Sequence, residues 1–165
     1  MIPAFRSRVH RFLSCRRIAV VGVSRDGKSF SRSVFGELRR RGYDAIPVNP
    51  LGGEADGLPF ARRLQDVQPP PEAALLLTPP AVTTEVVKDC AAAGIPRVWM
   101  HRGAGVGAAS APALEFCRVH GIEVVDGVCP LMYLSDTAWV HRAHRWCREH
   151  LSGRRPSRTN PPPPA

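Results

Sequence analysis

Five short apolar runs alternate along the chain with segments whose apolar residues recur at helical spacing. The first run, residues 18–23, is almost continuous, which is typical of a strand buried on both faces of a parallel sheet. The other predicted strands are residues 45–48, 73–77, 97–100 and 122–125, and the predicted helices between them are residues 31–41, 81–93 and 110–120. This order predicts an α/β fold: a Rossmann-like, doubly wound parallel sheet of about five strands with flanking helices.

Individual residues refine this prediction. Pro47 in the second run indicates a strand near an edge of the sheet or at a bulge. Residues 51–71 are rich in Gly, Pro and Asp, and predict a connection with a short strand and one helical turn. In the helix over 81–93, the residues expected to face the core are Val82, Val86, Val87 and Cys90.

Three parts of the chain are distinguished. Residues 1–14 predict a helical arm, residues 15–151 the folded domain, ending in a helix over 135–150, and residues 152–165 a disordered tail rich in Pro and Arg. That last helix carries a histidine or cysteine at every third position: His141, His144, Cys147 and His150. Successive members rotate by about −60° around the helix, so they do not converge on one ion. No metal site is therefore predicted.

The 165 residues carry a net charge of +9, but the charge sits at the ends. Residues 1–17 hold five arginines and no acid, and residues 139–158 hold six arginines and one acid. A nucleic-acid partner bound through these basic termini is an alternative function, although no aromatic stacking platform accompanies the arginines. No apolar run approaches the roughly 18 residues of a membrane helix.

The five cysteines are odd in number and include no CxxC pair. This pattern favours a reducing compartment, and we expect a cytoplasmic protein. A homodimer is left open by the sequence.

The loop after the first strand begins Gly22-Val23-Ser24. A dinucleotide fingerprint would place a second glycine where Ser24 stands. Serine hydroxyls, the N–H groups of the following helix and the charges of Arg25 and Lys28 could receive an anion there. The alternative is a tight turn at Gly22 with serines that only cap the helix.

The second strand ends in Asn49-Pro50, with no acid at its tip. NAD-binding folds hold the ribose hydroxyls with an Asp or Glu at about this point. The sequence therefore argues against NAD and favours a phosphorylated adenine nucleotide.

Five segments, IAVVGVSRD, GYDAIPVNP, LLLTPP, VWMHRG and GVCPLM, together resemble the small stand-alone CoA-binding proteins. Their fold is similar to the nucleotide-binding domain of the succinyl-CoA synthetase alpha subunit, and the resemblance covers about residues 15–135. It implies coenzyme A as the cofactor, bound at the carboxyl ends of the strands. The ligase subunit carries a lysine just after the second strand, where this chain has residues 51–53, so affinity for phosphate must come from elsewhere.

The resemblance also implies roles for individual residues. Gly22, Val23 and Ser24 would line the phosphate turn, Asn49 and Pro50 would flank the nucleotide, and Thr78, Pro79, Pro80 and Val82 would form a wall over adenine and ribose. A proline lip suits adenine because it is apolar and has no N–H donors.

Two residues are weak candidates for chemistry. His101 follows the fourth strand and could act as an acid or base, or bond a ligand phosphate or amide. Cys129 could form a mixed disulfide with the CoA thiol, although a buried structural role is commoner. Because no catalytic set is assembled, we expect a non-catalytic or regulatory module that binds coenzyme A or an acyl-CoA. The alternative is a Rossmann-type enzyme acting on acyl-CoA or a nicotinamide dinucleotide.

Overall fold

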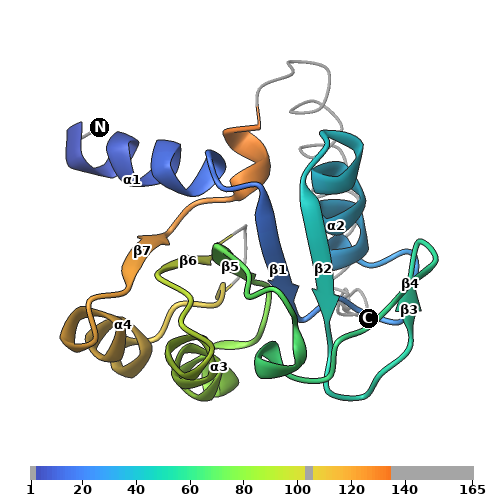
Figure 1. Cartoon of the computed structure of the whole chain (residues 1–165). Helices are drawn as coiled ribbons and strands as arrows, with labels where there is room; N and C mark the ends of the chain where they lie inside the picture. Colours follow the sequence, from blue (N-terminus) through green and yellow to red (C-terminus); the bar gives the residue numbers. More distant parts are fainter. Residues whose placement is uncertain (1–2, 103–105, 135–165) are drawn as a thin grey trace, which may run out of the picture. The chain divides into compact units, whose positions relative to one another are not determined.

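A computed structural model describes residues 3–102 and 106–134 of the chain (Figure 1). The helix predicted over 135–150, with its histidines and Cys147, and the tail over 152–165 lie outside the described residues. None of the helices within the described part is long and apolar enough to cross a membrane.

The main sheet has five parallel strands in the order β2-β1-β5-β6-β7. Each strand lies within two residues of its predicted range. Their bounds are β1 Arg17–Val21, β2 Asp44–Val48, β5 Ala73–Leu76, β6 Arg97–Met100 and β7 Glu123–Asp126. The predicted doubly wound α/β fold is confirmed.

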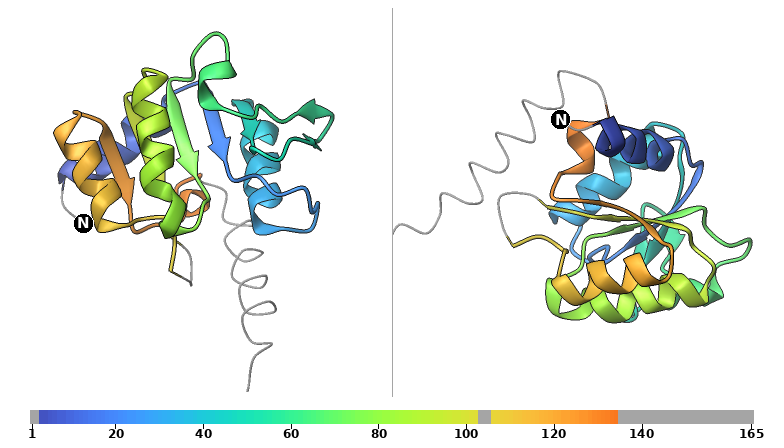
Figure 2. Two further views of the ribbon diagram at one scale, coloured as in Figure 1. Left: turned by 90° about the horizontal axis from the view of Figure 1, so that it is seen from below. Right: turned by 90° about the vertical axis from the view of Figure 1, so that its left-hand side faces the viewer.

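Four helices cover the two faces of this sheet: α1 Pro3–Leu13, α2 Phe30–Arg40, α3 Pro80–Ala92 and α4 Ala111–Val119. Helices α1 and α2 lie on one face, and α3 and α4 lie on the other (Figure 2). All four residues of the central strand β5 are buried because both faces are covered.

The connection from β2 to β5 contains no α-helix. It forms an antiparallel hairpin, β3 Glu54–Ala55 and β4 Leu58–Pro59, followed by a 3₁₀ turn, η1 Leu64–Asp66. Arg32 of α2 holds the hairpin: its guanidinium donates to the Glu54 carbonyl at 2.7 Å and pairs with the Asp56 carboxylate at 3.1 Å. The cationic Arg32 is therefore occupied by the fold and is not free for a ligand.

Strand β2 forms one edge of the sheet, as Pro47 predicts. Just past the hairpin, Ala61 pairs with its outer side. The Ala61 N–H donates to the Pro47 carbonyl and the Asn49 N–H donates to the Ala61 carbonyl, both at 2.9 Å. The segment that follows the hairpin is thus anchored at the carboxyl end of β2.

The orientation expected for Val82 is wrong. In α3 the buried residues are Thr83, Val87 and Cys90, while Val82 is 47% exposed. The buried polar Thr83 is satisfied because its hydroxyl donates to the Pro79 carbonyl at 3.1 Å. With Thr83 in the inward stripe, the helix turns Val82 outward, beside the carboxyl end of β5.

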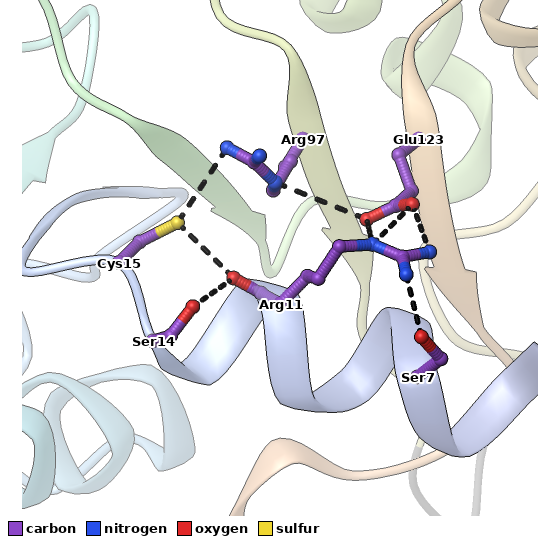
Figure 3. A network of polar contacts seen from close by, with 6 residues as sticks. All are labelled: Ser7, Arg11, Ser14, Cys15, Arg97 and Glu123. Atoms are coloured by element: carbon purple, nitrogen blue, oxygen red, sulfur yellow. Dashed lines mark hydrogen bonds and ion pairs between the residues drawn. The ribbon is translucent and has the colours of Figure 1, made fainter.

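Helix α1 packs against β6 and β7 through its apolar side. Val9 and Phe12 are buried, and the Phe12 ring meets Trp99 of β6 edge-on with centroids 5.2 Å apart. At the end of α1, Arg11 pairs with Glu123 at the start of β7, with Nε 2.9 Å from Oε2 (Figure 3). The helix is therefore a docked part of the core.

A buried thiol completes this contact. Cys15 Sγ lies 3.4 Å from the Arg11 carbonyl oxygen and 4.0 Å from Arg97 Nη1 (Figure 3). Burial raises the pKa of the Cys15 thiol, so it stays protonated at neutral pH. Like Cys90 and Cys117, it is an unoxidised cysteine in the core.

Candidate functional site

The sheet reverses its direction of winding between β1 and β5. From β1 the chain passes through α2 to β2 on one side, and from β2 it returns to β5 on the other side. Ligands of such sheets bind outside the carboxyl ends of the strands at this reversal. The loops that meet there begin at Gly22 after β1 and at Leu77 after β5.

Gly22 makes the closest approach between these loops. Its φ of +92° is in the region that favours glycine. A Cβ atom on Gly22 would lie 3.1 Å from the Leu77 carbonyl carbon and 3.3 Å from Thr78 Cγ2. Glycine is therefore required both by the turn and by the contact with the neighbouring loop.

The serines after Gly22 order the loop that leads into α2. The Ser24 N–H donates to Ser31 Oγ at 2.9 Å, and Ser24 Oγ accepts from the Asp26 N–H at 3.0 Å. Ser29 caps α2 by accepting from the Arg32 N–H at 3.3 Å. The serines therefore cap α2 and brace the loop, while binding of an anion at this helix N-terminus stays a prediction.

Asn49 ties the first loop to the second. Its Nδ2 donates to the Val23 carbonyl at 2.8 Å, and its Oδ1 accepts from the Leu51 N–H at 2.9 Å. Both polar atoms of the Asn49 amide are therefore hydrogen-bonded within the protein and hold the loop after β1 to the loop after β2. Pro50, the next residue, is exposed. No carboxylate stands at the tip of β2, as expected from the sequence.

The residues predicted to form a wall after β5 make a corner at the start of α3. Pro79 is the N-cap of α3 and Pro80 is its first residue. Thr78 Oγ1 lies 3.0 Å from Thr83 Oγ1, which fixes the side chain of Thr78 beside Gly22. Pro79 and Val82 are exposed, so an apolar surface borders the crevice.

His101 stands at the end of β6 and packs on Phe30, the first residue of α2. The two ring centroids are 4.8 Å apart and the rings are tilted by 33°. The Nδ1 atom of His101 is buried and has no hydrogen-bond partner among the described residues. Burial lowers the pKa of His101 to about 4, so at neutral pH the ring is uncharged. It can exchange a hydrogen bond with a ligand but brings no positive charge to a phosphate.

Cys129 lies in the loop after the edge strand β7, three strands from β1. The carbonyl of the preceding Val128 accepts from the Arg102 N–H at 3.2 Å and from Trp99 Nε1 at 3.0 Å, so this loop lies against the end of β6. The Cys129 thiol is partly exposed and in no disulfide, and the mixed disulfide with the CoA thiol stays a prediction.

Of the predicted cations, Arg25 and Lys28 are both exposed on the first loop. A further cation was missed by the sequence analysis: Arg62. Its guanidinium lies over Gly52, with Nη2 3.1 Å from where a Cβ atom of Gly52 would be. Among the described residues, no carboxylate is in ion-pair distance of Arg25, Lys28 or Arg62. A pair of glycines just after the second strand is the sequence signal that a side chain could cross there.

No group of three or more His, Cys, Asp or Glu side chains within residues 3–102 and 106–134 could hold a metal ion. The candidate site combines the Gly22 turn at the start of α2 with exposed cations and an apolar border. Such a site suits an extended anionic nucleotide.

Several solved structures share the fold. A conserved hypothetical protein from Pyrococcus furiosus is 28% identical, with a TM-score of 0.63 over 69% of this chain and 95% of that one. A protein from Thermus thermophilus is 26% identical, with a TM-score of 0.63 over 76% of this chain and 90% of that one. The dinucleotide-forming acetyl-coenzyme A synthetase 1 of Ca. Korarchaeum cryptofilum is 24% identical, with a TM-score of 0.61 over 70% of this chain but only 26% of the synthetase.

No curated protein matches the chain. The model of one family, the CoA binding domain, matches residues 16–135. This range takes in all five strands of the sheet and every loop of the crevice, and on this match the chain belongs to the CoA-binding domain family.

Proposed function

We propose that this protein binds coenzyme A, free or acylated, at the carboxyl ends of β1, β2 and β5, as a binding or regulatory module without a catalytic step of its own. The observation that carries the proposal is the Gly22 turn. It sits at the reversal point of the sheet, touches the loop after β5 and leads into the N-terminus of α2. Membership of the CoA-binding domain family supports the identity of the ligand.

The chemistry of coenzyme A matches what the crevice offers. Its pyrophosphate would lie at the Gly22–Ser24 turn, where the dipole of α2 favours an anion. Its adenine would rest on the exposed apolar lip of Pro79 and Val82. One of the proteins that share the fold is an acetyl-coenzyme A synthetase, which agrees with this assignment.

The site favours CoA over NAD because of what stands at the tip of β2. A bound NAD needs an acceptor for its ribose hydroxyls at this position. Here the Asn49 amide is already engaged with Val23 and Leu51. The guanidinium of Arg62, which lies over Gly52 further along this loop, accepts no hydroxyl hydrogen.

The non-catalytic role is supported by the state of His101. An uncharged ring packed on Phe30, with no carboxylate hydrogen-bonded to it among the described residues, lacks the partner that orients a general base. This part of the proposal predicts that acyl-CoA is bound without being turned over.

Calorimetric titration of the purified protein with CoA, acetyl-CoA and NAD tests the proposal. We expect CoA and acetyl-CoA to bind and to be recovered unchanged after prolonged incubation, with NAD binding much more weakly. Preferential binding of NAD would contradict the ligand assignment. Turnover of acetyl-CoA that disappears in His101→Ala, while CoA affinity is kept, would contradict the non-catalytic role.

A further inference from the structure

Two arginines converge on the loop that follows β2. The guanidinium of Arg62 lies over Gly52, with its Nη2, Cζ and Nε atoms all within 3.4 Å of the position of a Gly52 Cβ atom. The side chain of Arg25 lies over the next residue, with Cγ 3.3 Å from the position of a Gly53 Cβ atom. Arg25 comes from the loop after β1 and Arg62 from the connection between β4 and η1, so two separate segments bring these side chains to neighbouring glycines.

The backbone around Arg62 is held firmly. Its neighbour Ala61 is bonded to the end of β2 through the Pro47 carbonyl and the Asn49 N–H. On the other side, Gly53 rests against the ring of the buried Phe60. The position of Arg62 at the tip of β2 is therefore set by the fold before any ligand arrives.

The charges of Arg25 and Arg62 are not used within the described part of the protein. Their neighbours differ: Arg63 pairs with Asp66 at 2.8 Å, and Arg32 pairs with Asp56. The nearest carboxylates in sequence are Asp26 for Arg25 and Asp66 for Arg62. Asp26 accepts the Lys28 N–H in its own turn, and Asp66 is paired with Arg63. The guanidinium of Arg62 over Gly52 and the side chain of Arg25 over Gly53 bring two unpaired cations to one loop, which suits a phosphate.

The tip of the second strand is where sheets of this topology meet the ribose of a nucleotide. A carboxylate there binds the ribose hydroxyls, and an arginine there accommodates a phosphate on the ribose. We infer that Arg62, assisted by Arg25, binds the ribose phosphate of the nucleotide, so that this site selects ribose-phosphorylated nucleotides over their dephosphorylated forms. The inference rests on the proposed function. It assigns to Arg62 the phosphate contact that the sequence comparison expects from a lysine after the second strand, which this chain lacks.

Calorimetry with CoA and dephospho-CoA, which differ only in the ribose phosphate, tests this role. We expect the protein to prefer CoA by about tenfold or more, as for a charge-assisted hydrogen bond. Arg62→Ala is expected to remove most of that preference by weakening CoA, with the affinity for dephospho-CoA unchanged. Adenosine 3′,5′-bisphosphate and AMP should show the same contrast without the pantetheine arm.

Arg63→Ala is the matched control because it removes the same charge from the adjacent residue. Arg63 is exposed and already paired with Asp66, so this variant should keep the preference for CoA. Arg62→Lys should keep part of it, because a lysine supplies charge without the planar fork of donors. Both arginines are exposed, and a melting curve of each variant verifies the fold.

The outcomes separate this inference from the proposed function. If Arg62→Ala weakens CoA and dephospho-CoA equally, or if Arg63→Ala has the same effect as Arg62→Ala, the inference is wrong while CoA binding stands. If the wild-type protein binds neither CoA nor dephospho-CoA, both the proposed function and the inference are overturned.

Discussion

The buried ring of His101 makes the stability of the protein depend on pH in a defined direction. In the folded state, burial lowers the pKa of His101 to about 4, whereas an unfolded chain holds a histidine near its ordinary value of about 6.5. At pH 7 the ring is neutral in both states. As the pH falls below about 6.5 the unfolded chain takes up a proton that the folded protein does not, so folding loses stability down to about pH 4.

The size of this loss follows from the two pKa values. At pH 5 the unfolded histidine is almost fully protonated and the folded one is not, which corresponds to at most about 2 kcal/mol relative to pH 7. The variant His101→Gln removes the titrating group and leaves a polar side chain. The stability difference between wild type and variant should therefore shift by up to about 2 kcal/mol between pH 7 and pH 5.

Urea denaturation of both proteins at half-unit pH steps measures this difference. Other groups titrate in the same range, but they are common to both proteins and cancel in the comparison. Parallel pH profiles for wild type and His101→Gln would refute the account of a neutral buried ring. A wild type that gains stability relative to the variant as the pH falls would show instead that a negative partner raises the pKa of His101.

Three further substitutions test the fold around the site. Gly22→Ala should weaken CoA binding and destabilise the protein by about 1–3 kcal/mol more than Gly42→Ala, measured by urea denaturation, because both glycines have positive φ but only Gly22 touches a neighbouring loop; equal losses would contradict the close approach. Asn49→Ala should cost about 1–3 kcal/mol and lower CoA affinity, since two loops lose their shared bonds; unchanged calorimetry would show that these bonds are dispensable. Phe12→Ala should cost about 3–5 kcal/mol in the same assay by opening a cavity against Trp99, and a loss below about 1 kcal/mol would mean that α1 is not part of the core.

The strands were predictable because each is buried on both faces and therefore reads as an apolar run. The face of a helix was harder to predict. In α3 two inward stripes share Cys90, one through Val86 and Val82 and one through Val87 and Thr83. Hydrophobicity alone favours the stripe that begins with Val82 over the one that begins with Thr83. The structure buries Thr83 instead, because Pro79 and Thr78 satisfy its hydroxyl.

The candidate site was predictable at the level of loops and not at the level of side-chain contacts. The topological rule identifies the loops after β1, β2 and β5 from strand order alone. It cannot show that the Asn49 amide is hydrogen-bonded within the protein, that His101 packs on Phe30, or that the Arg62 side chain lies over Gly52. Each of these depends on a contact between residues far apart in the sequence, which a local pattern does not encode.

The outer side of β2 has a consequence for how copies of the protein can associate. In a strand, the N–H and C=O of one residue point to the same side, and the Pro47 carbonyl points outward to Ala61. Pro47 therefore presents no N–H donor along this edge. Ala61 is hydrogen-bonded to the Pro47 carbonyl and to the Asn49 N–H. An unprotected border is a template for a strand of another molecule, and here its carboxyl half is closed. Edge-to-edge pairing of two copies through this half of β2 would first have to displace Ala61.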